Sequence, residues 1–526
     1  MRGVINDALR WSIGCGIAAA GPILEGVHRL LLRLAPFQQR RLRQRYGIAA
    51  DTPIVEWSDL ASVLERRARQ AGAAKIAVTS GSTAIPKRVP YTDRRLRSAR
   101  WAYVDMFVRC RRAMRIRRPS LYIFSSLTSD DSLTALLLAE HRPPPALALL
   151  QAPYRVQSSP AVQRLALRYG TTAVRLWILA IANPGVLYAT NPSTLSTFFD
   201  DLARDWDAHA SLARDFCRRP YEFPREIHAV AGRLASRGSR RRLERIAASE
   251  TALPLEAFAP GVEAFICWTG GDLRPFLDRL TAHLPRERFR CVPMYSMSTE
   301  TIETVAHFSG GDVAFVPLAA GVCYEFLENG TRDCPDQLRT IEQLETGRTY
   351  TMVVSDRYGL KRYQTGDLFL CRGKVAGMPD LRFVGRRGVE HSFTGEKLTS
   401  EQLALVFARL REECPGLRGD DFLSCVPSHP SGTAIPHYTV VLVRGTRVGE
   451  TVRDEEIAER VDALLAAVNP EYQSKRNSRR LGPVRALQMT LAEFATRVGG
   501  DIGASWETQF KFLPFYAETW ESRART

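Results

Sequence analysis

The chain has 526 residues, of which 45% are hydrophobic, and its formal net charge is +17. This composition is that of a folded protein and excludes a disordered one, while the length exceeds the ~250–300 residues at which a single hydrophobic core usually stops growing. Two or three structural units are therefore expected. The positive charge favours anionic partners such as nucleotides, acidic substrates or nucleic acid.

The arginines are spread along the whole chain, with dense runs at residues 109–118 and 237–245. Neither run lies beside an aromatic stacking platform or a zinc-finger spacing, so we expect solvated helix faces and no nucleic-acid partner. The ten cysteines form no CxxC pair and lie near no histidine cluster, which argues against a zinc site and against a disulfide framework. A reducing, cytoplasmic setting is the simpler expectation.

Residues 1–75 are expected to be helical because apolar residues recur at helical spacing, as at Val27, Leu30, Leu31 and Leu34. Residues 11–24 resemble the apolar part of a signal peptide. Polar residues flank this segment closely, which leaves it too short to span a bilayer. We predict a helix packed on the protein, with no stable membrane insertion.

Short apolar runs then alternate with helical stretches, and this alternation predicts the α/β fold class. The first run, residues 75–79, ends in a loop of small residues, and the arginine-rich segment 93–118 resumes as a helix. Further strands are expected at residues 120–125, 264–269, 289–295, 314–318, 323–327, 349–354 and 367–371.

The character of the sequence changes again near Arg386. We expect a large N-terminal domain over residues 1–385, in which helices flank β-sheets, and a smaller α+β domain over residues 386–526. A helix at residues 455–468 and strands at 438–443 and 484–489 are predicted for the smaller domain.

One loop combines hydroxyl groups, glycine and lysine directly after the first predicted strand. Its sequence is Thr79-Ser-Gly-Ser-Thr-Ala-Ile-Pro-Lys87. Backbone N–H groups, O–H donors and an ammonium suit the oxygens of a polyphosphate, although the Walker pattern GxxxxGK[ST] is absent. Taken alone, such a loop is also an ordinary connection.

The loop resembles the phosphate-binding signature TSGSTGxPK of acyl-adenylate-forming enzymes, and further segments follow in the order of that superfamily. Thr269-Gly-Gly-Asp272 is similar to the adenine-side turn, and Tyr295-Ser-Met-Ser-Thr-Glu300 is similar to the aromatic-plus-glutamate motif. Tyr363-Gln-Thr-Gly-Asp367 resembles the ribose-binding motif, and Phe383-Val-Gly-Arg386 resembles the segment that joins the two domains.

Further details narrow the resemblance to the plant auxin-responsive acyl-acid amido synthetases, with this chain as a bacterial relative. Gly359-Leu-Lys-Arg-Tyr-Gln-Thr-Gly-Asp367 is similar to the family's GLYRYRxGD, and Cys323-Tyr-Glu-Phe326 is similar to its FEF strand. Residues 392–401 match its SIDxDKxxE stretch, and residues 503–511 match its GASxxQYK ending. The collinear order of these motifs carries the resemblance, because each motif is weak alone.

The resemblance implies that ATP, with Mg²⁺, converts a carboxylic acid into its acyl-adenylate and that pyrophosphate is released. Lys511 is expected to neutralise the charge that builds on the α-phosphate. Glu300 is expected to act in catalysis as the metal ligand; the alternative is a carboxylate at the start of a helix. Residues 1–385 would then bind ATP and acid, and residues 386–526 would form a mobile domain that carries the catalytic lysine and turns about residues 386–388.

The remaining nucleotide contacts are expected from the hydroxyl-rich loop, the adenine-side segments and the ribose motif. Ser80, Ser82 and Thr83 are assigned to the phosphates, Tyr295 to stacking on adenine, and Asp367 to the paired ribose hydroxyls. The full set is Thr79, Ser80, Gly81, Ser82, Thr83, Lys87, Thr269, Gly270, Gly271, Tyr295, Ser298, Thr299, Asp367, Arg386 and Lys397.

Two departures from the family pattern indicate a divergent branch with its own substrate. Ala84 replaces the second glycine of the loop, and it adopts a positive φ less readily than glycine does. Ser298-Thr299 replaces a serine pair, which keeps both hydroxyls and adds a methyl group.

The leading hypothesis is an amide-forming ligase that transfers the acyl group to an amine, such as an amino acid. A second hypothesis keeps the adenylation step and transfers the acyl group to coenzyme A or to a carrier protein. A third is a basic nucleic-acid-binding or non-catalytic module. The acid is expected to bind between the loop after residue 125 and the helices up to about residue 240, in a monomer or weak dimer.

Overall fold

The computed structural model describes most of the chain. The described residues are 2–70, 75–78, 87–118, 120–124, 133, 136–137, 152–153, 155–190, 192–269, 274–285, 287–294, 297–309, 312–387, 390–391, 393, 396, 398–417, 421–428, 435–444, 452–478, 481–491, 493–494, 497 and 513–516. These residues fall into two compact units. The first contains Met1–Trp268, Leu280–Thr365 and Phe369–Phe383, and the second contains Thr269–Arg279, Gly366–Leu368 and Val384–Thr526.

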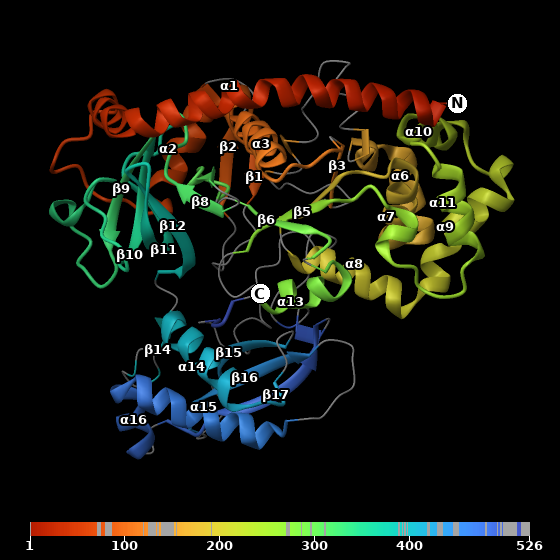
Figure 1. Ribbon diagram of the computed structural model, residues 1–526. Helices are drawn as coiled ribbons and strands as arrows, with labels where there is room; N and C mark the ends of the chain where they lie inside the picture. The colour runs from red at the N-terminus through yellow and green to blue at the C-terminus, as the bar shows by residue number, and fades with distance from the viewer. Residues whose placement is uncertain are drawn as a thin grey trace. The chain divides into compact units, whose positions relative to one another are not determined.

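The first unit is a mixed α/β structure, so the predicted fold class is confirmed (Figure 1). Its helices are α1 (Arg2–Arg45), α2 (Trp57–Gln70), α3 (Asp93–Ala113), α6 (Pro160–Tyr169), α7 (Thr171–Ala182), α8 (Pro192–Arg204), α9 (Trp206–Arg218), α10 (Arg225–Leu234), α11 (Ser239–Ala248), α12 (Leu255–Phe258) and α13 (Arg274–His283), the last of which extends into the second unit.

Its strands are β1 (Lys75–Val78), β2 (Arg88–Tyr91), β3 (Leu121–Ile123), β4 (Val186–Tyr188), β5 (Ala264–Cys267), β6 (Arg290–Pro293), β7 (Val305–Ser309), β8 (Asp312–Val316), β9 (Val322–Glu328), β10 (Thr349–Asp356), β11 (Tyr363–Val375) and β12 (Met378–Arg386). Parts of β11 and β12 belong to the second unit.

A parallel sheet in the order β3-β4-β5-β6 forms one core of the first unit. Parallel strands are usually covered on both faces and therefore consist of continuous apolar residues. β4 and β5 follow this rule, since all their residues are buried. Val186, Ile266 and Val292 pack in one cluster with Met106 and Cys110 of α3.

A second sheet has the order β12-β11-β10-β9, and β9 and β10 are antiparallel. Its core includes Phe326, Tyr350 and Phe369, against which Leu32 of α1 and Leu64 of α2 pack. The N-terminal helices therefore complete the hydrophobic core of this sheet.

The helix α1 lies along the whole upper edge of the first unit in Figure 1. Asn6 donates to the carbonyl of Ala235 after α10, at 2.9 Å, and Gly14 accepts from Arg111 of α3 at 2.7 Å. Near its other end, Gln39 exchanges hydrogen bonds with the backbone of Val322 and Tyr324 at 3.0 and 2.8 Å. The segment that resembles a signal peptide is thus part of a helix fixed to the protein at several points.

The second unit is a smaller α+β structure. Its elements are β13 (Glu390–His391), β14 (Leu398–Thr399), α14 (Ser400–Glu413), β15 (Phe422–Ser428), β16 (His437–Arg444), α15 (Asp454–Val468), α16 (Pro470–Asn477) and β17 (Arg485–Thr490). β16 pairs antiparallel with β15 and parallel with β17.

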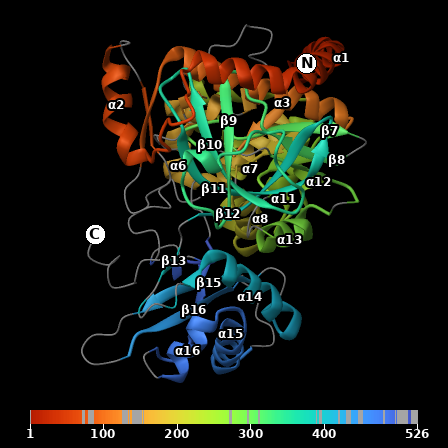
Figure 2. The same cartoon turned by 90° about the vertical axis from the view of Figure 1, so that its left-hand side faces the viewer.

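The helices α14 and α15 cover one face of this sheet (Figure 2). Alternate strand residues face the same side, and Leu423, Val440 and Leu442 accordingly join one core with Leu403 and Val461 of the helices. α14 begins at a complete capping box, in which Thr399 and Gln402 each bond the other's backbone.

Candidate active site

The hydroxyl-rich loop of residues 79–87 connects the two strands of a hairpin. β1 and β2 pair antiparallel, and Val78 lies opposite Arg88 at the end that the loop joins. Thr79, Ser80, Gly81, Ser82 and Thr83 lie outside the described residues, as does Ala84. Lys87, the last residue of the motif, is described and immediately precedes β2.

Lys87, Glu300 and Tyr363 form a hydrogen-bonded cluster. The Lys87 ammonium lies 2.9 Å from Glu300 Oε1 and donates to Tyr363 Oη at 2.9 Å. The Tyr363 hydroxyl donates to the same Glu300 oxygen at 3.2 Å. The side chains of Lys87 and Glu300 are 17% and 4% exposed, so this ion pair is shielded from bulk water. The cluster joins three segments that are more than 60 residues apart in the sequence.

Aromatic rings enclose the ammonium on one side. Lys87 Nζ lies 5.8 Å from the ring centre of Trp57 and 5.5 Å from that of Tyr363, and the two rings meet edge to face. Cation–π attraction at these distances holds the ammonium in place. The lysine side chain therefore turns inward, toward Glu300 and the two rings.

The turn that carries Glu300 is fixed through its backbone. Tyr91 of β2 donates to the carbonyl of Thr299 at 2.7 Å, and Arg95 of α3 donates to the carbonyl of Glu300 at 2.5 Å. Ser298 Oγ accepts from the N–H of Thr301 at 3.2 Å, which closes the turn. Burial raises the pKa of the Tyr91 hydroxyl, so this group remains a donor at physiological pH.

Glu300 does not begin a helix, since residues 297–304 form a turn and irregular backbone that lead into β7. The alternative interpretation as a helix-start carboxylate is therefore wrong. Its carboxylate is instead buried among hydrogen-bond donors, where desolvation is offset by the charge of Lys87.

The turn between β10 and β11 presents Tyr363 to the cluster. Asp356 accepts from the backbone N–H groups of Tyr358 and Leu360 at 2.8 and 3.0 Å. Gly359 has φ +119°, and a Cβ there would lie 2.7 Å from Leu64 Cδ2, so only glycine fits. Burial raises the pKa of Asp356, with Arg95 opposing this effect from 4.0 Å.

A buried ion pair anchors the residue before Tyr363. Arg362 binds Glu325 of β9 through two contacts of 3.0 Å, and both side chains are only 2% exposed. Arg43 of α1 also contacts Glu325. The motifs at residues 323–326 and 359–367, which the sequence analysis treated separately, are thus joined by the ion pair of Glu325 with Arg362.

The other predicted site residues are only partly described. Asp367 lies within β11, is buried, and follows Gly366, whose φ of +77° marks a break in regular strand geometry. Thr269 follows β5, and Arg386 ends β12. Both Asp367 and Thr269 fall in the second unit. The remaining predicted residues Gly270, Gly271, Tyr295, Lys397 and Lys511, together with the side chain of Arg386, lie outside the described residues.

Tyr363 is the member of the hydrogen-bonded cluster that the sequence analysis did not single out. It stands at the start of the ribose-type motif, of which only Asp367 was singled out. The sequence of the motif does not indicate that its tyrosine contacts Lys87. That contact depends on how the fold brings β11 and the residue before β2 together.

Within the described residues, no group of three or more His, Cys, Asp or Glu side chains could hold a metal ion by itself. The buried carboxylate of Glu300 nevertheless fits Mg²⁺, which prefers oxygen ligands and commonly binds through one or two carboxylates and substrate phosphates.

Comparison with solved structures gives the fold. The chain superimposes on an acyl acid amido synthetase, AtGH3.15 in complex with 2,4-DB, with a TM-score of 0.67 and 17% identity over 96% of this chain and 93% of the other. A second GH3.15 structure gives the same TM-score over 92% of this chain. The chain thus has the fold of these two acyl acid amido synthetase structures.

Sequence comparison points to the same family. Residues 315–386 match the GH3 family central domain. The chain is 28% identical over 163 residues to the human GH3 domain-containing protein, covering 30% of each chain. It is 32% identical over 141 residues to the 4-substituted benzoates–glutamate ligase GH3.12 of Arabidopsis thaliana, covering 26% of this chain and 24% of that one.

Residues 315–386 are therefore similar to the GH3 family central domain, and the chain has the fold of the GH3.15 structures, so the resemblance predicted from its motifs is confirmed. The matched region spans about 30% or less of the length of these curated relatives.

Proposed function

We propose that the protein is an ATP-dependent ligase that adenylates a carboxylic acid, releases pyrophosphate, and transfers the acyl group from AMP to an amine, which releases AMP and forms an amide. The cluster of Lys87, Glu300 and Tyr363 supports this proposal most strongly. It places an ammonium and a carboxylate at the end of a loop rich in hydroxyl groups, in a chain with a GH3-type fold.

In the proposed reaction, the carboxylate oxygen of the acid attacks the α-phosphorus of ATP, and the bond to the β-phosphate oxygen breaks. Lys87 and the hydroxyls of Ser80, Ser82 and Thr83 would bind the β- and γ-phosphate oxygens. Donors fixed before the reaction stabilise developing charge without reorganisation, and the contacts of Lys87 with two rings and a carboxylate supply such fixation.

Glu300, with the neighbouring hydroxyls of Ser298 and Thr299, would hold Mg²⁺. A bound Mg²⁺ would neutralise charge on the phosphate oxygens. Tyr363 keeps the Glu300 carboxylate oriented through its hydrogen bond.

The other contacts to the nucleotide come from the family resemblance. Tyr295 would stack on adenine beside residues 269–271, Asp367 would accept from the ribose hydroxyls, and Arg386 and Lys397 would lie near the phosphate or ribose. Lys511 would stabilise the charge on the α-phosphate. We propose that residues 386–526 move about residues 386–388 between the adenylation and transfer steps.

The substrates are proposed from the printed activities of relatives. One relative is named for joining 4-substituted benzoates to glutamate, and others are named as indole-3-acetic acid-amido synthetases of rice and Arabidopsis thaliana. For this chain we propose a small carboxylic acid and an amino acid, in the cytoplasm of a bacterium, with no nucleic-acid partner.

Product analysis tests the proposal. The full chain is incubated with ATP, Mg²⁺ and a panel of carboxylic acids, with either a mixture of amino acids or coenzyme A, and the products are identified by mass spectrometry. An acyl-amino acid that requires ATP is expected. A thioester formed without any amide would overturn the amide-forming assignment and leave the adenylation step in place.

A further inference from the structure

A continuous apolar ridge runs along the outer face of α1. Ile23, Val27, Leu30, Leu34 and Phe37 are each between 41% and 69% exposed. They follow one another at intervals of four, three, four and three residues, and at 100° per residue this spacing keeps them on one side of the helix. The ridge therefore presents apolar side chains to the surroundings over about four helical turns.

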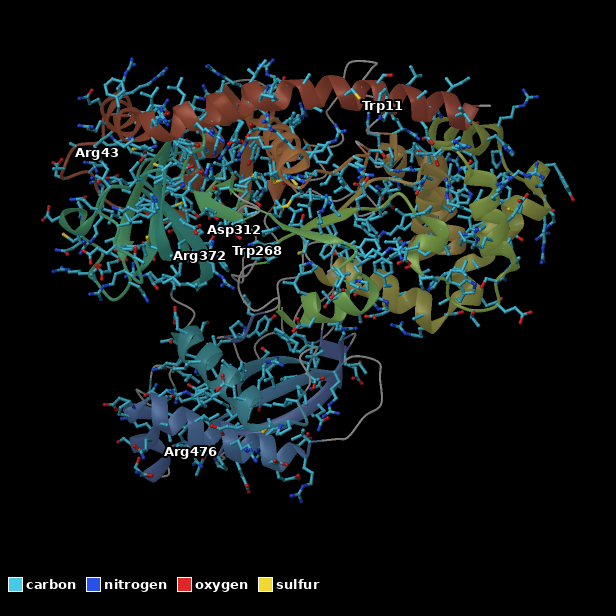
Figure 3. The ribbon with its side chains drawn as sticks, viewed as in Figure 1. Trp11, Arg43, Trp268, Asp312, Arg372 and Arg476 are labelled. Carbon is cyan, nitrogen blue, oxygen red and sulfur yellow. The ribbon has the colours of Figure 1, made fainter. Side chains whose placement is uncertain are left out.

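Two further apolar side chains lie on the same side of α1 toward the N-terminus. Ile5 and Leu9 are each 50% exposed and lie in line with Val27 and Leu34, whereas Trp11, which is 67% exposed, lies about 120° around the helix from the ridge. Trp11 lies toward one end of α1 and Arg43 toward the other in Figure 3. Large contiguous apolar patches are rare on soluble proteins and usually mark an interaction surface.

The charges around the ridge are of one sign. α1 contains eight arginines and only two acidic residues, Asp7 and Glu25. Arg33, Arg40 and Arg41 are exposed; Arg33 and Arg40 lie beside the ridge, and Arg41 follows it on the same side of the helix. Both acidic residues lie toward the protein and are paired, with Arg10 at 3.3 Å and with Arg29 at 3.4 Å. The outward face is thus apolar and basic.

From this arrangement we infer that α1 lies in the interface of an anionic lipid bilayer, parallel to the membrane plane. A helix with Leu, Ile and Phe on one face and arginines along its border is typical of such in-plane association, because the apolar side chains enter the acyl boundary while the arginines meet anionic headgroups.

The inner face of α1 argues against a transmembrane position. The most apolar window of 18 residues has a mean hydropathy of 1.2 and is 18% buried, so α1 is long and apolar enough to cross a membrane by composition. Its inner residues, however, are bound to the first unit: Arg10 donates to the carbonyl of Leu234 at 2.9 Å, and His28 bonds His307 at 3.1 Å. Extraction into a bilayer would break these contacts.

A second copy of the chain fits the ridge less well than lipid does. In a twofold dimer the same patch meets itself. The exposed arginines of both copies would then gather around one apolar seam without any exposed acidic residue on this helix to pair with them. Anionic headgroups supply the missing negative charge.

Vesicle sedimentation tests the inference with the full chain. Binding to phosphatidylcholine vesicles that contain phosphatidylglycerol is expected, with weaker binding to phosphatidylcholine alone and at high salt. The double variant Ile23→Glu/Leu30→Glu is expected to lower the affinity about tenfold or more, because it places charge on the surface that enters the bilayer. Arg33→Gln/Arg40→Gln should weaken the preference for phosphatidylglycerol.

The matched control is Leu167→Glu. Leu167 is an apolar residue of α6 that is 84% exposed, and its substitution should leave vesicle binding unchanged. Adenylation in solution and the melting temperature should be unchanged in all these variants. Equal binding by the wild type and Ile23→Glu/Leu30→Glu would overturn the inference. So would a dimer in sedimentation equilibrium that Ile23→Glu/Leu30→Glu dissociates, with no binding of the wild type to vesicles.

Discussion

Tyr363 links the two charged members of the candidate site. Its hydroxyl accepts from Lys87 and donates to Glu300, so it fixes both groups in one geometry. The proposed reaction assigns no proton transfer to Tyr363, and we regard it as a positioning residue. Its effect should therefore appear in how well the nucleotide is bound and oriented.

Tyr363→Phe keeps the ring over the ammonium and removes the hydroxyl. We expect acid-dependent pyrophosphate exchange to fall about tenfold to hundredfold, since a hydrogen bond to a charged group contributes about 1.5–3 kcal/mol. Exchange kinetics with varied ATP measure this effect. Tyr358→Phe, on the same turn, is the control and should behave as the wild type. Unchanged kinetics in Tyr363→Phe would exclude the positioning role.

His28 and His307 form a buried pair between α1 and β7. Their rings are stacked at 5.2 Å, and one nitrogen of each shares a hydrogen bond of 3.1 Å. Burial lowers the pKa of His28 to about 3, and Arg109 adds to this effect. Burial also lowers the pKa of His307, with Arg109 and Arg29 acting in the same direction and Glu25 opposing them. Both imidazoles are therefore neutral in the folded protein.

The neutral histidine pair makes the folded protein less stable at acid pH. In the unfolded chain a histidine takes up a proton near its ordinary pKa of about 6.5, whereas the folded pair does so only at lower pH. The free energy of unfolding is thus unaffected by the pair above about pH 6.5 and decreases as the pH falls toward 3. At about pH 5.5 His28 alone costs about 1.4 kcal/mol.

His28→Gln should reduce this acid-side loss of stability. Denaturant unfolding between about pH 7.5 and 5 measures it, and the slope with pH should be smaller in the variant than in the wild type. His228→Gln changes an exposed histidine of α10 and should leave the slope as it is. If both variants show the wild-type slope, the His28–His307 pair is not the source of the acid sensitivity.

Among individual residues, sequence analysis identified Lys87 and Glu300 because each belongs to a motif with a known order. It could not identify the pairing of Arg362 with Glu325. These residues are 37 positions apart, and one sequence carries no information about which buried charges meet. Their contact depends on β9 and β10 lying side by side, with Val322 opposite Asp356.

The strand β9 holds the turn before β11 through the ion pair of Glu325 with Arg362. Glu325→Gln would leave the guanidinium of Arg362 buried with reduced compensation, and removing one partner of a buried pair costs about 3–5 kcal/mol. Glu328 lies on the same strand and pairs with Arg339 at 2.9 Å, near the surface. Glu328→Gln should cost less than about 1 kcal/mol. Chemical denaturation measures the free energy of unfolding of both variants. Equal losses of stability would contradict the anchoring role of Glu325.

The elements that sequence predicted best are those with strong periodicity or length. The helices of residues 1–75, the helix of 93–118 and the strands β9, β10, β16 and β17 all lie where they were expected, within a few residues. β4 was missed. It has three buried residues directly after the apolar helix α7, and such a short run cannot be distinguished from a continuing helix by periodicity.

The two units carry different parts of the proposed chemistry. Lys87, Glu300 and Tyr363 lie in the first unit, while Asp367 and Thr269 lie in the second. The longest segment of the second unit starts at Val384, close to the domain boundary predicted at residue 386. The proposed hinge at residues 386–388 remains a prediction. Which residues of the two units would meet depends on how the units are arranged in each step of the reaction. A single sequence does not reveal that arrangement.

Lys511→Ala should abolish adenylation and leave the free energy of unfolding and the affinity for ATP nearly unchanged, because the proposed role of Lys511 is confined to the transition state. Calorimetric titration with ATP and single-turnover formation of acyl-adenylate measure the two properties separately. Normal formation of acyl-adenylate in Lys511→Ala would contradict the assignment of this lysine.

The exchange of labelled pyrophosphate into ATP tests the central claim most directly, since it reports the reverse of adenylation and needs no amine. The full chain is assayed with Mg²⁺ and a panel of carboxylic acids, beside Glu300→Gln as an inactive control. We predict exchange that requires an acid and falls by about a hundredfold or more in Glu300→Gln. Exchange that proceeds equally without any acid, or equally in Glu300→Gln, would contradict the account.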